Sequence, residues 1–400
     1  MQKKEYLLDA KKISIKTVVE SWVILALTIF LLGFFFFPSS SKHNTFFYIT
    51  VCAPVVLLIP CYYKKLFPQN LLIFTTLWFI FYLYLNSLWS IHYNTAQSLK
   101  YLRYSLTLFC LFSSIYLVQY KKPSYSILLF PAFIVIGFFH SIYGIFDHFH
   151  KLQTPLTIRY SDPIDSAMLV GLLLLTCIWL FIESKSWKPK LIYAFLSLPF
   201  ITIILLSKSR GPQLALFCTI PLIVYYQKQH LKKIIISTVI LLLSFVILLI
   251  STDISQTLFN RGFSVPYRLD IWLTSFNESI KYFWFGQGAS HKPPLLTPSG
   301  SFNHSHNILL SIFRMGGITA VFLFIIQMVL CFYSGIKNKT SSHRLWIIWL
   351  FFGIFCLMSN GKYPLSRPSA AWLAYWIPVA FICASYSHFL SKKACKKISN

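Results

Sequence analysis

Residues 166–183 read SAMLVGLLLLTCIWLFIE, a run whose only charged side chain is the last one. A helix needs about 20 mostly apolar residues to cross the hydrocarbon core of a bilayer, so this run predicts a transmembrane helix. Eleven similar runs lie at 19–37, 46–63, 71–90, 102–120, 126–146, 190–206, 212–226, 234–251, 307–334, 345–359 and 370–390. The sequence therefore predicts an all-α integral membrane protein with about twelve transmembrane helices.

The composition of the chain supports this fold class. Of its 400 residues, 56% are hydrophobic, 18% are aromatic and only 12% are charged, and the mean hydropathy is +0.64. Soluble domains carry about 25% charged residues, twice this share. These values exclude a soluble enzyme, a disordered tail and a secreted disulfide scaffold.

The formal net charge of +26 is explained by topology, because cytoplasmic loops of membrane proteins collect Lys and Arg. With the N-terminus inside, 22 of the 36 basic residues fall on cytoplasmic segments, and both termini are predicted to be cytoplasmic. Five lysines precede the first apolar run, which we interpret as a retained span and not as a cleaved signal peptide. We expect no nucleic-acid partner.

The other 14 basic residues lie in outer loops or within spans, and seven of them are Arg. Because guanidinium groups bind phosphate in bidentate geometry, this outer set is a candidate phosphate site. The chain has no Walker sequence, no GxGxxG and no outer DxD pair. Nucleotide chemistry and a metal-held pyrophosphate are therefore not expected.

Three segments follow from the pattern of runs. Residues 1–251 form a membrane bundle of helices 1–9, residues 252–306 form a long outer loop, and residues 307–400 form helices 10–12. Within the loop, Arg268–Trp284 has helical amphipathic spacing that suits a helix on the membrane surface. Its apolar side comprises Leu269, Trp272, Leu273, Phe276, Ile280 and Phe283, and its polar side Asp270, Asn277, Glu278 and Lys281.

Two basic elements in outer segments are candidate anion sites. Ser207-Lys208-Ser209-Arg210-Gly211-Pro212 joins two spans and combines cations, hydroxyls and a turn glycine. The structural alternative is a tight hairpin with snorkelling cations. Arg268 opens the amphipathic helix, at the end where the helix dipole disfavours a cation. Its structural alternative is a surface pair with Asp270.

Phe302-Asn303-His304-Ser305-His306-Asn307 precedes the tenth span. His306 would stand at the membrane surface, where an imidazole can accept a proton near neutral pH, so it is a candidate general base. A metal site with His304, His306 and the Asp147–His150 segment is the weaker interpretation, and we expect no metal. Asn307 can cap the helix by itself.

Further basic residues complete the candidate set. Arg314 lies about two turns into the tenth span, and a charge within a span indicates a functional site unless it snorkels to the surface. Arg159, Lys362, Arg367, Lys100 and Arg103 are weaker candidates for lipid headgroup contacts.

In this order, these elements resemble the O-antigen ligase family of bacterial inner-membrane proteins. The family pattern has an S-R-G turn between spans, a large periplasmic loop that opens with R-x-x-x-W, a W-x-G-x-G element and an H-N at the next helix. The corresponding segments are Ser209–Gly211, Arg268–Trp272, Trp284–Gly288 and His306-Asn307. The similarity covers about residues 155–365. Arg159–Pro163 is similar to the shorter-loop element of the family, but Ile164-Asp165 departs from its usual P-N.

The resemblance implies a GT-C-like glycosyltransferase, multi-pass in the inner membrane and active at its periplasmic face. It would transfer polymerised O-antigen glycan from undecaprenyl pyrophosphate to a sugar of lipid A–core, with inversion and without metal or other cofactor. Arg210 and Arg268, helped by Lys208 and by Arg159 or Arg314, would bind the pyrophosphate. His306 would deprotonate the acceptor hydroxyl.

Alternatives remain open at this point. The family also contains O-antigen polymerases and protein O-glycosyltransferases, which the short motifs do not separate, although a single long loop late in the chain is more typical of a ligase. A polysaccharide or lipid transporter is the rival class. Two six-span halves with a long central cytoplasmic segment would favour it. Here the connection between spans six and seven is only 184–189.

Overall fold

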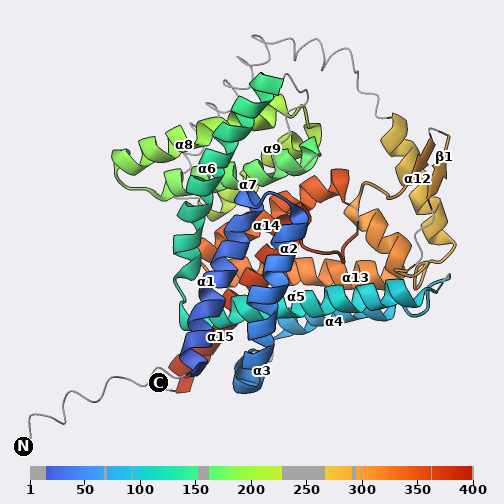
Figure 1. Ribbon diagram of the computed structural model, residues 1–400, viewed down its shortest axis with the longest axis horizontal. Coiled ribbons are helices and arrows are strands. Elements are labelled where there is room, and N and C mark those ends of the chain that lie inside the picture. Colours follow the sequence, from blue (N-terminus) through green and yellow to red (C-terminus); the bar gives the residue numbers. More distant parts are fainter. Residues whose placement is uncertain are drawn as a thin grey trace, which may run out of the picture.

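The computed structural model describes residues 15–66, 70–91, 93–151, 162–227, 266–290, 294–298, 300–361 and 363–398. The described chain is almost entirely helical (Figure 1). Its helices are α1 (Ile15–Phe36), α2 (Ser40–Phe47), η2 (Tyr48–Cys52), α3 (Ala53–Leu66), α4 (Leu71–Leu85), α5 (Thr95–Lys121), α6 (Tyr125–Lys151), α7 (Pro163–Glu183), α8 (Trp187–Leu206), α9 (Arg210–Tyr226), α12 (Pro266–Ile280), α13 (Ile308–Lys337), α14 (Ser341–Asn360), η4 (Trp372–Trp376) and α15 (Ile377–Ile398). Strands β1 (Leu295–Thr297) and β2 (Gly300–Phe302) form an antiparallel hairpin.

The predicted membrane fold is confirmed. Among the described residues, nine helices are long and apolar enough to cross a membrane, and α4 is a shorter apolar helix. Eleven of the twelve predicted runs fall on described helices, including the 17-residue α9. The twelfth run, 234–251, lies outside the described residues. The GT-C-like detail stays a prediction.

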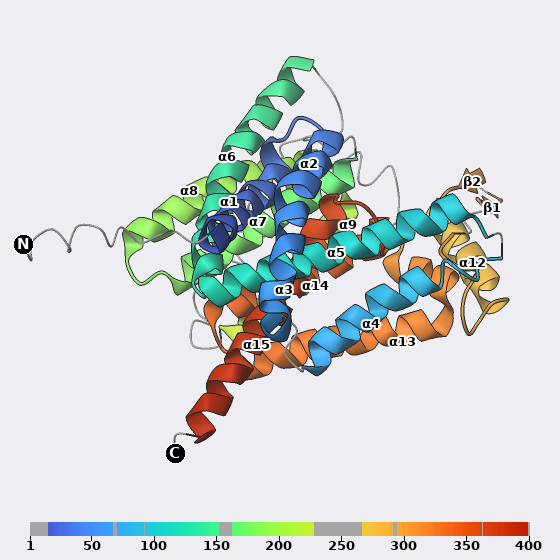
Figure 2. The same ribbon diagram turned by 60° about the horizontal axis from the view of Figure 1, so that its bottom comes forward.

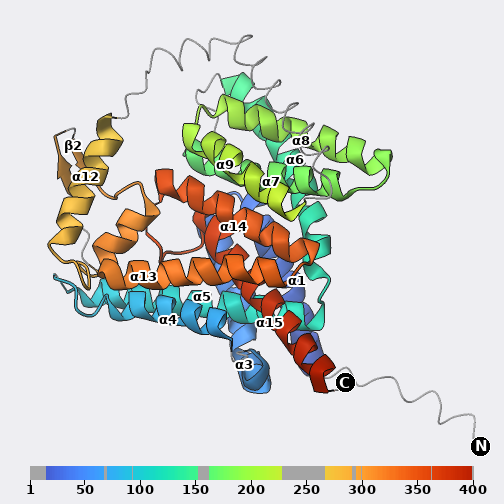
Figure 3. The ribbon, with the colours of Figure 1, turned by 180° about the vertical axis from the view of Figure 1, so that it is seen from behind.

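The helices pack around α14 and α15. Figure 2 shows α4, α5 and α13 side by side, with α12 and the hairpin at one end of this group. Seen from behind, α14 lies between α13 and α9 (Figure 3), α7 packs on both α14 and α9, and α8 packs on α7. The centre holds fully buried tryptophans, and the ring of Trp346 stacks on Phe381 at 4.2 Å. Aromatic stacking of this kind fixes how the two central helices pack.

Several polar groups inside the bundle find partners within the protein, because a bilayer core offers no water to bind them. The indole of Trp349 donates to the hydroxyl of Thr176 at 2.8 Å. Near the predicted cytoplasmic end, Lys121 and Glu20 form an ion pair of 2.6 Å. This pair compensates the charge of an acidic side chain within the first span.

One predicted helix boundary is wrong, and one interruption within a predicted helix was not foreseen. The amphipathic helix ends at Ile280 and not at Trp284, because the chain turns there and the N–H of Gly286 donates back to the carbonyl of Tyr282 at 2.8 Å. The predicted tenth span is one element, α13, but it is interrupted at Gly317, where φ is 65° and ψ is −168°. Apolar periodicity does not report such an interruption.

Candidate active site

The interruption of α13 is repaired by the segment 283–288, which follows α12. A broken helix leaves carbonyls before the break and N–H groups after it without helical partners, and burial makes such groups costly. Backbone hydrogen bonds to the segment 283–288 satisfy them: Gln287 N to Arg314 O (2.9 Å), Gly288 N to Met315 O (2.9 Å) and Ile318 N to Phe283 O (2.7 Å). The outer loop is thereby attached to the membrane bundle by main-chain bonds.

This attachment explains the two glycines at its centre. Gly286 has φ of +71°, and a β-carbon there would lie 2.3 Å from the carbonyl oxygen of Met315. At Gly317, with φ of +65°, a β-carbon would lie 2.4 Å from the backbone of Trp284. Both positions need positive φ and a backbone approach that only glycine permits. The W-x-G-x-G element thus packs its backbone directly against the interruption of α13.

Helix α12 presents its apolar side away from the protein. The side chains of Leu269 and Leu273 are 57% and 54% exposed, whereas Ile271, Ser275 and Ser279 are buried. A helix on the membrane surface would place its uncovered apolar side in lipid. This arrangement agrees with the predicted place of α12 on the membrane surface. The domain boundaries at 251 and 306 stay predictions.

On the polar side of α12, Glu278 is turned toward the protein. Its carboxylate forms an ion pair with the guanidinium of Arg314 at 3.0 Å. The Arg314 side chain is only 9% exposed, so it does not snorkel to the surface. Sequence periodicity missed this partner because the segment 283–288 turns the chain and brings α12 back against α13.

Arg268, in the first turn of α12, is partly buried beside Asp162. Burial lowers the pKa of Arg268, and the nearby carboxylate of Asp162 raises it. Asp162 is also the N-cap of α7, and its second oxygen accepts a hydrogen bond from the amide of Asn360 at 2.8 Å. The amide also reaches Asp165 at 3.4 Å. Arg268 is therefore held near the outer ends of α7 and α14.

The turn between α8 and α9 exposes its two cations. The side chains of Lys208 and Arg210 are exposed, whereas Ser207 and Ser209 are buried. Lys208 has φ of 52°, and the N–H of Ser209 donates to the hydroxyl of Ser207 at 3.3 Å. The buried serines thus close the turn, and the cations project from it, as the anion-site prediction requires.

This turn lies against the end of α14. The backbone of Gly211 packs so closely on Ser359 that a β-carbon would lie 2.1 Å from the serine hydroxyl. Ser359 directly precedes Asn360, the partner of Asp162. The end of α14 therefore contacts both the turn that carries Arg210 and the side chain of Asp162, beside which Arg268 lies.

His306 lies in a constrained backbone position before α13. Its φ is 49°, a left-handed conformation, and its ring centroid is 3.9 Å from that of His304. The preceding Ser305 is buried and its hydroxyl bonds that of Ser275 on α12 at 2.7 Å. Asn307 caps α13, as the sequence predicted, by accepting the N–H of Leu309 at 3.0 Å. The backbone that carries the imidazole is thereby anchored to α12 and to the start of α13.

Tyr363 closes the group from the loop after α14. Its hydroxyl donates to the carbonyl of Asn303 at 2.8 Å. Burial raises the pKa of Tyr363, and the nearby charge of Arg314 lowers it. Tyr363, Asp162 and Asn360 are members of the group that the sequence reasoning did not select. Only Asp162 had a usable signal, as an N-cap followed by Pro163.

Contacts on α7, α12 and α14 therefore link the segments that carry Lys208, Arg210, Arg268, His306 and Arg314. The candidates Arg159 and Lys362 lie outside the described residues. Within the described ranges, no three His, Cys, Asp or Glu side chains form a group that could hold a metal ion. The arrangement presents cations and the paired imidazoles of His304 and His306, which can neutralise an anionic leaving group and accept a proton.

Comparison with known proteins agrees with this arrangement. Residues 194–325 match the model of a family described as O-antigen ligase. Over 131 residues the chain is 30% identical to an O-antigen ligase of Pseudomonas aeruginosa. The aligned region covers 32% of this chain and 32% of that relative. The match thus spans about a third of the length of the curated relative. The family range contains the α8–α9 turn, α12, the segment 283–288, His306 and Arg314. Residues 194–325 are therefore similar to the O-antigen ligase family, in agreement with the resemblance that the motifs indicated.

Proposed function

We propose that this protein transfers O-antigen glycan from undecaprenyl pyrophosphate to a sugar hydroxyl of lipid A–core at the periplasmic face of the inner membrane. One observation carries the proposal: α12 carries a cation and also contacts the residue next to the candidate base. Arg268 lies in its first turn, and Ser275 on its buried side bonds Ser305, the neighbour of His306. A single helix thus positions the groups that the two substrates need.

Charge neutralisation is the main requirement on the donor side. When the bond between the anomeric carbon and the pyrophosphate oxygen breaks, negative charge develops on the pyrophosphate, and preorganised cations stabilise it. In this proposal Arg210 and Arg268 bind the pyrophosphate, with Lys208 and Arg159 in support. The energy of the donor bond drives transfer, so the reaction needs no nucleotide and no metal.

His306 acts on the acceptor side. Its imidazole takes the proton of the acceptor hydroxyl, and the freed oxygen attacks the anomeric carbon from the face opposite the leaving pyrophosphate. One glycosidic bond forms as one bond to pyrophosphate breaks, and the configuration inverts. The constrained backbone of His306 and its contact with His304 limit how far the ring can move.

Arg314 has a different part in this proposal. Because its guanidinium is buried and paired with Glu278, we assign it the positioning of α12 and not direct contact with pyrophosphate. The ion pair acts beside the main-chain bonds of the segment 283–288. Together they fix the position of α12 against α13, and so the position of Arg268 relative to His306.

The predicted topology is supported by the contacts among outer segments. The α8–α9 turn, the N-terminus of α7, residues 303–306 and the loop after α14 were all expected on the same side of the membrane. These segments contact one another in the ways described above. An arrangement with one of them on the other side would not permit these bonds.

A deletion strain tests the proposal. Lipopolysaccharide and extracted polyprenyl-linked glycan are compared after complementation with wild type, with His306→Ala, and with His150→Ala as an exposed histidine control outside the cluster. We expect core-only lipopolysaccharide and stranded glycan in the deletion strain and in His306→Ala, and rescue by His150→Ala. Loss of a general base typically reduces rate about 10²- to 10⁴-fold.

Other outcomes would redirect the assignment. Core capped by a single repeat unit would mean an O-antigen polymerase, in which the same chemistry uses another acceptor. An unchanged ladder would remove both roles and leave protein glycosylation or transport. Full rescue by His306→Ala would refute the assignment of the base.

A further inference from the structure

Two exposed arginines lie close together outside the candidate active site. The charges of Arg103 on α5 and of Arg367 in the loop after α14 both act on the hydroxyl of Tyr48 in η2. Three separate elements thus bring the two guanidinium groups, which we call the arginine pair, to one place. Neither residues 21–146 nor residues 279–400 contain Asp or Glu, so the segments that carry the arginine pair supply no carboxylate to compensate it.

The loop that carries Arg367 is fixed by two buried tryptophans. The indole of Trp372 donates to the carbonyl of Ser366 at 3.1 Å, and the indole of Trp376 donates to the carbonyl of Pro364 at 2.8 Å. Both tryptophan side chains are buried in the bundle. Because these bonds hold carbonyls of the loop on the N-terminal side of Arg367, its backbone has a defined position on the protein.

Trp372 also connects this loop to η2. Its ring contacts the ring of Phe47 edge-on with 6.1 Å between centroids, and Phe47 directly precedes Tyr48. Figure 1 shows the loop after α14 beside α2. Helix α5 packs on η2 in turn, and the guanidinium of Arg103 lies 5.6 Å from the ring centre of Tyr104. Packing among aromatic side chains therefore sets where the arginine pair lies.

The same loop reaches the segment that carries the candidate base. Tyr363, whose hydroxyl donates to the carbonyl of Asn303, lies four residues before Arg367, and Asn303 lies three residues before His306. A fully extended chain spans at most about 3.6 Å per residue, so the α-carbons of Tyr363 and Arg367 are at most roughly 14 Å apart. A short oligosaccharide can span the separation between the arginine pair and the candidate base.

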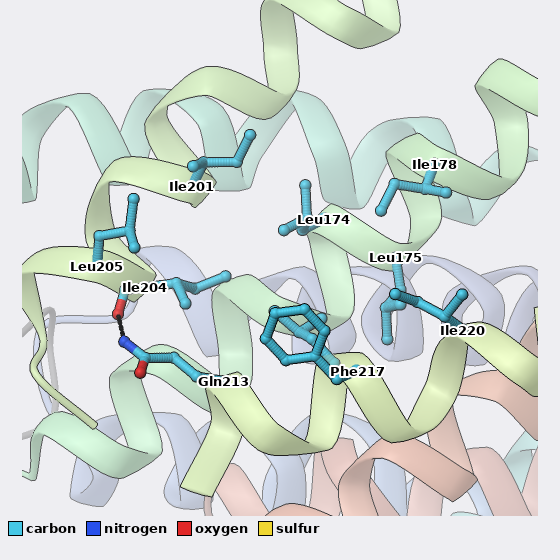
Figure 4. A pocket seen from close by; sticks show the side chains of 10 residues that line it. Leu174, Leu175, Ile178, Ile201, Ile204, Leu205, Gln213, Phe217 and Ile220 are labelled. Atoms are coloured by element: carbon cyan, nitrogen blue, oxygen red, sulfur yellow. Dashed lines mark hydrogen bonds between the residues drawn. The ribbon is translucent and has the colours of Figure 1, made fainter. Parts of the chain in front are cut away.

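The arginine pair is separate from the cations assigned to the donor. Helix α14 contacts α9, whose first residue is Arg210, and it also contacts η4, next to the loop that carries Arg367. The apolar groove lined by Leu174, Ile201 and Phe217 shares α9 with Arg210, and neither member of the arginine pair lines it (Figure 4). The protein thus presents two groups of cations, on different neighbours of α14.

Charge and rigidity indicate what the arginine pair binds. Two guanidinium groups near one phenol hydroxyl suit a phosphate group, which accepts bidentate hydrogen bonds from Arg. A contact with the head group of any nearby phospholipid needs only a flexible cation that reaches the surface. A fixed loop that also contacts the segment of the candidate base favours a ligand that must be oriented for reaction. The acceptor lipid A–core, a phosphorylated amphiphile, is such a ligand.

We propose that Arg103 and Arg367 bind a phosphate group of the acceptor lipid, with Tyr48 as a further hydrogen-bond donor, and so present the acceptor hydroxyl to His306. The inference rests on the proposed function, because it deepens the acceptor side of that reaction. It assigns the phosphates of the two substrates to different cations. The arginine pair touches the acceptor away from the reacting atoms and selects for a phosphorylated acceptor.

Binding of the acceptor in the absence of donor tests this assignment without activity. The purified full-length protein in detergent micelles is titrated with lipid A–core, or with lipid A–core dephosphorylated by hydrofluoric acid, and bound lipid is counted by native mass spectrometry. We expect wild type to bind the phosphorylated lipid about tenfold more tightly. The double variant Arg103→Gln/Arg367→Gln should lose this preference, whereas Lys281→Gln, an exposed cation outside both groups, should keep it.

Two results of this titration would overturn the inference. One is equal binding of the two lipids by wild type, a comparison that needs no variant. The other is displacement of lipid A–core by phosphatidylglycerol at equal concentration, which would mark a general head-group site.

Steady-state kinetics separate acceptor binding from donor binding. The double variant Arg103→Gln/Arg367→Gln should raise the KM for lipid A–core about tenfold and leave kcat and the KM for the polyprenyl-linked donor unchanged. With the dephosphorylated acceptor, the double variant and wild type should behave alike. A raised KM for the donor would contradict the separation of the two groups of cations.

The two proposals fail in different ways. If wild type transfers no glycan to lipid A–core but still binds it with a preference that the double variant loses, the proposed function is wrong and the lipid site stands. If transfer is normal, and wild type and the double variant use both acceptors equally well, the assignment of the arginine pair alone is wrong.

Discussion

Replacing Glu278 by Gln should destabilise the protein more than replacing its partner Arg314 by Gln. The two form an ion pair of 3.0 Å, but their surroundings differ, with 9% of the Arg314 side chain exposed and 28% of the Glu278 side chain. Removal of one partner leaves the other charge without compensation, and the cost depends on how well water reaches it. The buried guanidinium is therefore the more costly one to leave alone.

The magnitudes follow from this asymmetry. Breaking a buried pair typically costs about 3–5 kcal/mol, and the partial exposure of Glu278 places this pair near or below the lower end, at about 2–3 kcal/mol for Glu278→Gln. For Arg314→Gln the remaining carboxylate is better hydrated, and we expect about 1–2 kcal/mol. The double variant should lose less than the sum of the two, with a coupling of about 1–2 kcal/mol.

Unfolding of the purified protein in mixed micelles, titrated with SDS, would measure these differences. Lys281→Gln, an exposed charge change just after α12, is the matched control and should stay within about 0.5 kcal/mol of wild type. Equal losses for Glu278→Gln and Arg314→Gln, or additive losses in the double variant, would refute the idea that an isolated buried charge determines the cost.

Three further results are expected. Gly286→Ala should abolish rescue of the deletion strain and lower the free energy of unfolding by more than about 2 kcal/mol in the same SDS titration. Gly300→Ala, also at positive φ but with the nearest atom 4.0 Å from an added β-carbon, should lower it by about 1 kcal/mol. Equal effects would show that conformational strain alone matters. Arg210→Lys should lower donor turnover about tenfold or more in a purified transfer assay although the charge is kept, and wild-type turnover would argue against bidentate binding. Transfer should persist in excess EDTA, and its loss with recovery on added divalent cation would contradict the metal-independent mechanism.

Transmembrane helices could be predicted from the sequence because the bilayer imposes a length and a polarity on each run. The run 166–183 lies within α7 and the run 345–359 within α14, with boundaries a few residues away. The cap at Asn307 was equally predictable, because a side-chain oxygen at that position satisfies local N–H groups whatever the rest of the fold does. These features depend on neighbours in the chain and on the solvent.

The candidate site was predicted as a set of residue types but not as an arrangement. Arg210, Arg268 and His306 stood out because their chemistry is unusual at the outer ends of spans. Their neighbours did not, since Asn360 and Tyr363 carry no local signal, and Glu278 has helical spacing that suggests a solvent-facing position. Pairing across long sequence separations leaves no periodic trace.

The sequence by itself determined that this is a helical membrane protein, and it predicted cations and an imidazole in outer segments, because burial in lipid and charge placement act on each segment locally. Only the tertiary structure decided that α13 breaks at Gly317, that the segment 283–288 satisfies the break, and that Arg314 is turned toward Glu278. The physical reason is that backbone groups freed at a helix break must find partners. Which segment supplies them is settled by the packing of the whole bundle.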